Sequence, residues 1–107
     1  MVQRTDVLLA VQAALLGAVP RALRAVTCGW TDGVVIRFMF DGEVDPANEK
    51  DMQAVAAQVA SELSGEKVTP DIISVDYPGD LKAHGLEGWA YMRRESIAFK
   101  PLRETRV

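Results

Sequence analysis

The sequence predicts an α+β fold: a four-stranded, antiparallel-rich sheet with two helices on one face, in the chain order α-β-β-α-β-β. Two segments repeat apolar residues at helical spacing, and four shorter ones are rich in β-branched and aromatic residues and bounded by turn residues. A chain of 107 residues is long enough to bury one hydrophobic core. We expect a single domain over residues 1–95, followed by a C-terminal tail over 96–107.

The two helices are expected over residues 6–16 and 46–64. Thr5 or Asp6 is a suitable cap for the first helix, because a short polar side chain there accepts a hydrogen bond from an unpaired backbone N–H. The second helix follows Asp45, an acidic cap, and has proline at its first position, where no N–H is needed. Apolar residues recur every three or four positions in both segments, which predicts one buried face for each helix.

Four strands are expected, over residues 23–30, 34–40, 72–75 and 88–94. The turn Thr31-Asp32-Gly33 joins the first two as a hairpin. Alternation places Ile36 and Phe38 on one face of the second strand and Met39 on the other. With both helices on one face, the opposite face of the sheet is expected to be open, covered by the polar or aromatic side chains of Thr27, Arg37, Tyr91 and Arg93.

Charge is distributed unevenly along the chain. Residues 32–87 hold twelve acids and four bases, whereas the two ends together carry a net charge of +5. An acidic middle region favours a basic partner. It disfavours direct binding of nucleic acid, which needs a basic footprint. No segment approaches the roughly 20 apolar residues of a membrane span, so no membrane partner is expected.

Residues of the common catalytic and metal sites are sparse. Cys28 is the only cysteine, which excludes an intrachain disulfide and a multi-cysteine metal site and favours a cytoplasmic location. It is expected inside a strand, as a small buried apolar group. His84, the only histidine, is expected in a solvated loop. The sequence therefore predicts no enzyme, no catalytic residue, no metal and no cofactor.

Two groups of acidic residues form the candidate partner-binding site, one before the second helix and one around the third strand. Aromatic residues beside acids are typical of interfaces, because a ring buries much area and the acids steer a basic surface. The candidates are Asp41, Glu43, Asp45, Asp76, Asp80 and Glu87, with Tyr77 and Trp30 as aromatic anchors. Helix capping, loop solvation and a divalent-cation site are the alternative interpretations of the first group.

Three segments carry a family resemblance: LRAVTCGWTDGVVIRFMFDGEVDP at 23–46, IISVDYPGDL at 72–81 and GWAYMRRE at 88–95. A hairpin that ends in Arg-Phe-x-Phe-Asp-Gly-Glu before an acidic helix, and a closing Trp-x-Tyr-x-Arg-Arg strand, resemble small bacterial immunity proteins of contact-dependent growth inhibition systems. The resemblance implies a protein that binds and neutralises the toxic C-terminal domain of a delivered toxin, often an RNase.

The leading hypothesis is therefore a non-enzymatic inhibitor that docks on a basic toxin domain through its acidic side chains. A self-associating structural or regulatory module, which pairs a sheet face or edge strand with a second copy, is the main alternative. A small hydrolase built on carboxylates, with a divalent cation, is the third.

Overall fold

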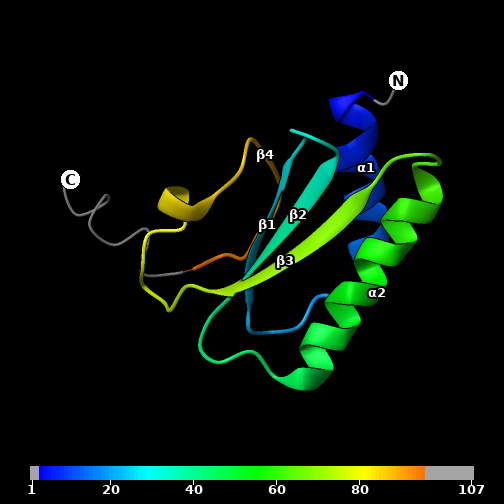
Figure 1. Ribbon diagram of the computed structural model, residues 1–107. Coiled ribbons are helices and arrows are strands. Elements are labelled where there is room, and N and C mark those ends of the chain that lie inside the picture. The colour runs from blue at the N-terminus through cyan, green and yellow to red at the C-terminus, as the bar shows by residue number, and fades with distance from the viewer. Residues whose placement is uncertain (1–2, 96–107) are drawn as a thin grey trace.

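A computed structural model describes residues 3–95 of the chain, and the predicted tail 96–107 lies outside the described residues. The elements follow the predicted order and form an α+β fold (Figure 1). They are α1 (Arg4–Leu15), β1 (Leu23–Gly29), β2 (Val34–Phe40), α2 (Pro46–Glu62), β3 (Val68–Ser74), the short 3₁₀ helix η1 (Lys82–His84) and β4 (Gly88–Met92).

The sheet is mixed, with the spatial order β3-β2-β1-β4. β1 pairs antiparallel with β2 and with β4, as an antiparallel-rich sheet requires, but β2 and β3 are parallel. The parallel pair arises because α2 carries the chain back along the sheet before β3 begins, which a tight hairpin cannot do. As a result, the C-terminal ends of β2 and β3 lie at the same edge of the sheet.

The predicted helix boundaries agree with those of the structure to within two residues. Asp45 caps α2 as predicted, and its Oδ1 accepts a hydrogen bond from Ala47 N–H at 2.8 Å. The prediction that Thr5 or Asp6 caps α1 is wrong: Gln3 is the capping residue, and its own N–H donates to Asp6 Oδ2 at 3.4 Å. Asp6 is the third residue of the helix, and its carboxylate accepts the backbone N–H of the capping residue instead of acting as the cap itself.

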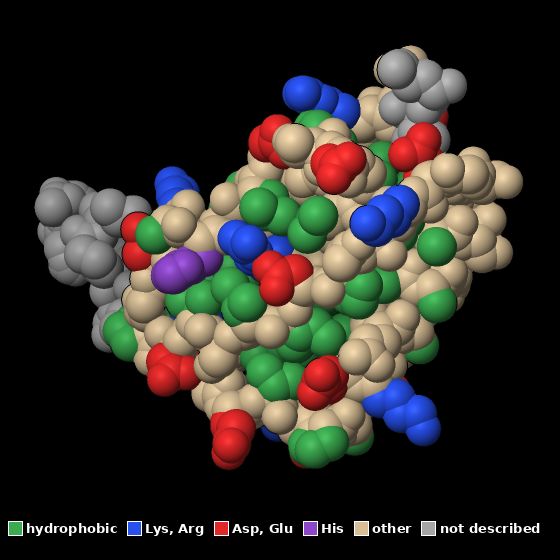
Figure 2. Space-filling view, in the orientation of Figure 1, with side chains coloured by type: hydrophobic (Ala, Val, Ile, Leu, Met, Phe, Trp, Pro, Cys, Tyr) green, Lys and Arg blue, Asp and Glu red, His purple; other side chains and the backbone are tan. Residues whose placement is uncertain are grey.

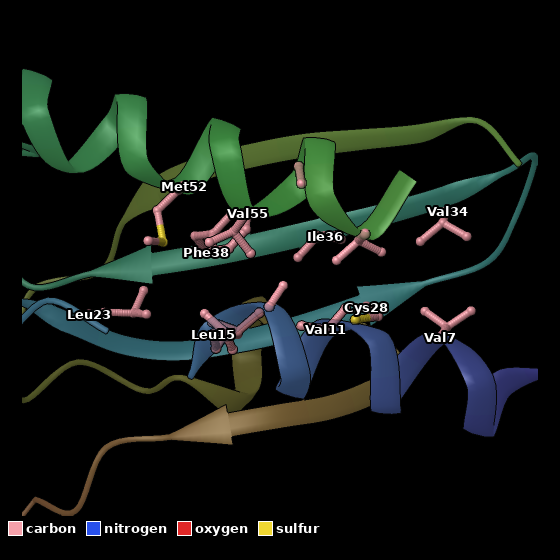
Figure 3. Close-up of a cluster of buried hydrophobic side chains, with 14 of the residues drawn as sticks. Val7, Val11, Leu15, Leu23, Cys28, Val34, Ile36, Phe38, Met52 and Val55 are labelled. Atoms are coloured by element: carbon pink, nitrogen blue, oxygen red, sulfur yellow. The ribbon is translucent and has the colours of Figure 1, made fainter. Parts of the chain in front are cut away.

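The main core lies between the sheet and the two helices. Figure 3 shows Val11 and Leu15 of α1, and Met52 and Val55 of α2, directed toward the strands. Opposite them, Phe38 and its alternating neighbours on β1 and β2 are fully buried. Both helices thus cover one face of the sheet, as predicted from the set of elements, and each buries its apolar stripe.

The second face is not open, contrary to expectation. The chain after β3 folds over it, and Leu81 packs there with Ala25 and Met39 in a second buried cluster. Thr27 is fully buried beneath this cover, and its hydroxyl accepts the Leu86 N–H at 3.1 Å. Tyr91, expected on this face, instead packs against the helix-side core, because the pairing register of β1 and β4 shifts between Val26 and Thr27.

Candidate acidic interface

The two acidic segments meet at the edge where β2 and β3 end. Tyr77 N–H donates to Asp41 Oδ1 at 2.9 Å, and Gly42 N–H donates to Asp76 Oδ1 at 2.9 Å. The Ser74 hydroxyl donates to the Gly42 carbonyl at 2.6 Å. These bonds hold the loop after β2 against the loop after β3. We call this surface the acidic edge, and define it by Asp41, Glu43, Asp45, Asp76 and Asp80.

The acidic edge keeps most of its negative charge. Within residues 3–95, Asp41 is the one member in an ion pair, with its Oδ2 3.5 Å from Arg93 Nη2. Asp45, Asp76 and Asp80 accept backbone N–H groups instead. Such bonds fix the position of a carboxylate without cancelling its formal charge.

The pKa of Asp41 is lowered from its ordinary value, first by the hydrogen bond from the Tyr77 N–H and then by Arg93. The bond favours the charged form because only a carboxylate accepts it fully. Asp41 therefore stays ionised while it ties the two loops together.

Figure 2 shows how charge is spread over one face of the molecule. In this view the acidic side chains stand apart from one another, with hydrophobic side chains gathered between them. On this face the acidic side chains are therefore separate charges and do not form a continuous acidic patch.

Tyr77 lies beside the acidic edge, close to two guanidinium groups. The Arg24 and Arg93 guanidinium carbons are 5.4 and 6.0 Å from the centre of its ring. Cations over an aromatic face are attracted by the ring quadrupole. The half-buried ring is therefore held in place before any partner arrives.

Arg24 and Glu95 form a buried ion pair behind Tyr77, which the sequence did not reveal. Arg24 is 2% exposed, and its Nε and Nη2 donate to the two Glu95 carboxylate oxygens at 2.7 and 2.8 Å. Its Nη1 and Nη2 also donate to the carbonyls of Val75 and Gly79 at 2.7 and 3.0 Å. The arginine thereby fastens β1 to the loop after β3 and to the end of the domain.

The pKa of Glu95 is lowered, chiefly by the hydrogen bond from Arg24 and against the opposing effect of burial. The pairing register of β1 and β2 shifts between Leu23 and Ala25. This irregularity allows the charged side chain of Arg24, in an otherwise apolar strand, to reach Glu95. The one available signal was an arginine inside the apolar run of β1.

A shallow apolar groove of about 240 Å³ adjoins these residues. It is lined by Tyr77, Leu81, Trp89 and Met92 among others, and Asp80 of the acidic edge is also part of its wall. Met92 is 56% exposed. An aromatic and aliphatic groove beside carboxylates has the composition of an interface centre with a polar rim.

Trp30 and Glu87 lie at the opposite edge of the sheet. Trp30 follows the C-terminal end of β1, and its N–H is 3.4 Å from Glu87 Oε1. The Arg4 guanidinium lies 5.1 Å from the centre of the Trp30 ring. The structure therefore brings six of the eight predicted partner-binding residues to one edge and places these two at the other.

The lone cysteine and the lone histidine occupy structural positions. Cys28 is fully buried in β1, and burial raises the pKa of its thiol to about 12, so it is not a nucleophile at neutral pH. His84 ends η1, and its backbone carbonyl accepts the Arg37 Nη1 at 2.7 Å. Among residues 3–95, no three His, Cys, Asp or Glu side chains are grouped to hold a metal ion.

Comparison with known families decides the class. The model of the MafI2 immunity protein family matches residues 4–95. The chain belongs to the MafI2 immunity protein family. A search of the curated proteins finds no match. The membership supports the expected immunity-protein class, although the family named is MafI2 and not that of contact-dependent growth inhibition.

Neither helix of the described chain has the length and apolar character that crossing a bilayer requires. The match covers every helix and strand given above, from the first residue of α1 to Glu95. The family match therefore includes all four strands and the loops at both ends of the sheet.

Proposed function

We propose that this MafI2 family member neutralises a bacterial toxin by binding its toxic domain through the acidic edge. The observation that carries the proposal is the junction of the two loops by Asp41 and Asp76, which presents separate acidic segments as one prepared surface. Binding by a surface fixed in advance loses less conformational entropy than binding by free loops.

The proposed partner is a basic domain, with an RNase as the preferred candidate. A nuclease needs lysines and arginines to hold phosphates. Glu43, Asp76 and Asp80 make no ion pair within the described residues and are available to such cations. An inhibitor that covers a phosphate-binding surface blocks the enzyme by contact alone, with no catalytic group of its own.

Tyr77 and the groove beside it supply the apolar part of the proposed interface. Leu81, Trp89 and Met92 offer area for aliphatic stems or an aromatic ring of the toxin, while Asp80 meets a charged head. Strands of about seven residues span roughly 23 Å. Because Trp30 and Glu87 lie that far away, we assign the docking to the acidic edge and not to them.

The proposal extends to the biological setting. A toxin delivered into the cell as in contact-dependent growth inhibition, and a cytoplasmic immunity protein that meets it there, fit the sequence resemblance and the single buried cysteine. Neither an enzymatic activity nor a cofactor of the chain is part of this proposal.

The test uses the C-terminal domain of a candidate toxin taken from the open reading frame immediately upstream of this gene. The purified 107-residue chain and that domain are expected to elute together in size-exclusion chromatography and, for a nuclease, to lose cleavage of a labelled RNA. Association is expected to slow as salt rises, because exposed charges are screened. Failure to form a complex, or a complex that retains full toxic activity, contradicts the proposal.

A further inference from the structure

β3 is an outer strand of the sheet, and every second residue of it directs its backbone N–H and C=O away from β2 (Figure 1). At one end of the strand, the Lys67 carbonyl accepts the Val34 N–H at 2.8 Å. At the other end, the Val75 N–H donates to the Phe40 carbonyl at 2.8 Å. Odd-numbered residues therefore face β2, and the even-numbered ones face outward: Val68, Pro70, Ile72 and Ser74. We call this outward side the free side of β3.

Pro70 divides the free side into two parts. It has no N–H, so a further strand laid along β3 would lack a bond at this position. Beyond the proline, the N–H groups of Ile72 and Ser74 have no strand partner among residues 3–95. Unpaired backbone groups at the side of a sheet bind an extended peptide, which supplies the missing donors and acceptors at the same spacing. The open stretch is therefore 72–74, and it leads directly into the acidic edge.

The other outer strand, β4, is protected against such pairing. Its register against β1 shifts between Val26 and Thr27, and an irregular strand is a poor template for a further one. In addition, the side chain of Gln12 on α1 donates from Nε2 to the Ala90 carbonyl at 3.3 Å. Of the two outer strands of the described sheet, β3 is thus the one with a stretch that accepts a further strand.

We propose that an extended segment of the toxin domain adds a strand to β3 along 72–74 and places a basic side chain at Asp76. The inference rests on the proposed toxin inhibition and specifies how the partner binds. Asp76 lies two residues, or about 7 Å, beyond Ser74 along the chain. It is exposed, accepts the Gly42 N–H and the Ser74 hydroxyl, and makes no ion pair within the described residues. Its charge is therefore available to a cation on the added strand.

A second copy of the chain fits this stretch less well than a toxin segment does. Two β3 strands paired antiparallel about Ile72 would place Pro70 of each copy opposite Ser74 of the other, so the ladder would lack a bond at both ends. A strand of another sequence lacks the bond at Pro70 alone. Each copy also carries a net charge of −3, whereas a basic domain complements Asp76 and the acidic edge.

Amide hydrogen exchange tests the added strand in the full chain without any substitution. When the toxic domain binds, exchange of the Ile72 and Ser74 N–H groups is expected to slow by at least about tenfold, because they gain hydrogen bonds. Ile73 is the internal reference, because its N–H faces β2 in the free chain as well. Unchanged exchange at Ile72, or slowing there no greater than at Ile73, overturns the strand and leaves the proposed inhibition standing.

A matched pair of substitutions at Ser74 isolates the outward N–H. Ser74→Ala and Ser74→Pro both lose the hydroxyl that bonds Gly42 and Asp76, but only the proline variant also loses the N–H. The dissociation constant for the toxic domain is expected to be about tenfold higher for Ser74→Pro than for Ser74→Ala, because the ring also occupies the place of the added strand. Equal dissociation constants for the two variants overturn the proposal.

Val68→Pro is the second control. It removes an outward N–H on the other side of Pro70, at the first residue of β3, where a proline is tolerated. Its dissociation constant should stay within about twofold of the wild-type value, and weakening equal to that of Ser74→Pro overturns the assignment to 72–74. Absence of any complex overturns the proposed inhibition together with this inference. A complex that charge reversal at the acidic edge weakens, but Ser74→Pro does not, overturns the strand alone.

Discussion

The two edges of the sheet are built in different ways. At the acidic edge, loops that are more than 30 residues apart in sequence are joined by hydrogen bonds from Tyr77 and Gly42 to carboxylates, with a buried ion pair behind them. At the opposite edge, Trp30 packs near Gly88 under the guanidinium of Arg4. Parallel pairing of β2 and β3 explains the difference, because it brings two loops of the chain to one edge.

Hydrogen bonds to carboxylates join the loops of the acidic edge, whereas at the other edge packing of the Trp30 ring is accompanied by one longer hydrogen bond, from the Trp30 N–H to Glu87 at 3.4 Å. Charged hydrogen bonds are directional and fix loops in one arrangement. Packing of an indole tolerates small displacements but not added volume. Substitution of a charged side chain should therefore destabilise the acidic edge most, and added side-chain volume should destabilise the other edge.

The largest effect is expected at Arg24. Arg24→Met should lower the free energy of unfolding by about 2–4 kcal/mol, because it leaves Glu95 with Arg93 as its remaining cation and the Val75 and Gly79 carbonyls without their donor. Urea denaturation measures the loss. Arg21→Met, an exposed control close in sequence, should change stability by less than about 0.5 kcal/mol. A loss of under about 1 kcal/mol for Arg24→Met would show that the ion pair does not anchor this edge.

Glu95→Gln is expected to cost about 1.5–3 kcal/mol at neutral pH, since it replaces charged hydrogen bonds by neutral ones. The folded pKa of Glu95 lies below its ordinary value of 4.5. Its contribution is therefore fully present above pH 4.5 and is lost as the pH falls through the lower, folded pKa.

The stability gap between the wild-type chain and Glu95→Gln should accordingly narrow as urea denaturation is repeated at successively lower pH. Asp41, whose pKa is also lowered, is present in both proteins, but it shares Arg93 with Glu95 and contributes to the gap through that cation. A gap that stays constant down to acid pH would refute the assignment of this acid sensitivity to Glu95.

A smaller effect, about 1–3 kcal/mol, is expected from Gly88→Ala at the other edge. A Cβ on Gly88 would lie 2.5 Å from Cη2 of Trp30 and 3.3 Å from Cδ2 of Leu8, so the indole must move. In a double-mutant cycle, Trp30→Leu should relieve most of the loss caused by Gly88→Ala. Simple additivity of the two substitutions would mean that the Trp30 ring is not what Gly88 accommodates.

The sequence predicted those features whose causes are local. The bounds of β2 and the cap of α2 follow from the Thr31-Asp32-Gly33 turn and the Asp45-Pro46 pair, which act within a few residues. Apolar periodicity likewise predicted that each helix buries one face. These signals do not depend on how the elements are later arranged.

Features that depend on distant residues could not be predicted in the same way. Nothing local to β3 indicates that it runs parallel to β2, and the strand predicted over 72–75 instead begins at Val68 and contains Pro70. β3 is an outer strand of the sheet, which explains how it accommodates Pro70. The missing N–H of the proline falls on the side of β3 that has no neighbouring strand. The Arg24–Glu95 pair, 71 residues apart in sequence, was missed for the same reason.

The most direct test of the central claim compares charge reversal at the two edges. Glu43→Lys/Asp80→Lys alters the acidic edge, and Glu66→Lys/Glu87→Lys makes the same change of charge at the opposite edge. Stopped-flow association with the toxic domain at low salt should be slowed by at least about tenfold by the first pair and only about twofold by the second, because steering depends on charges near the docking surface. Equal slowing by both pairs, or greater slowing by the second, would contradict docking at the acidic edge.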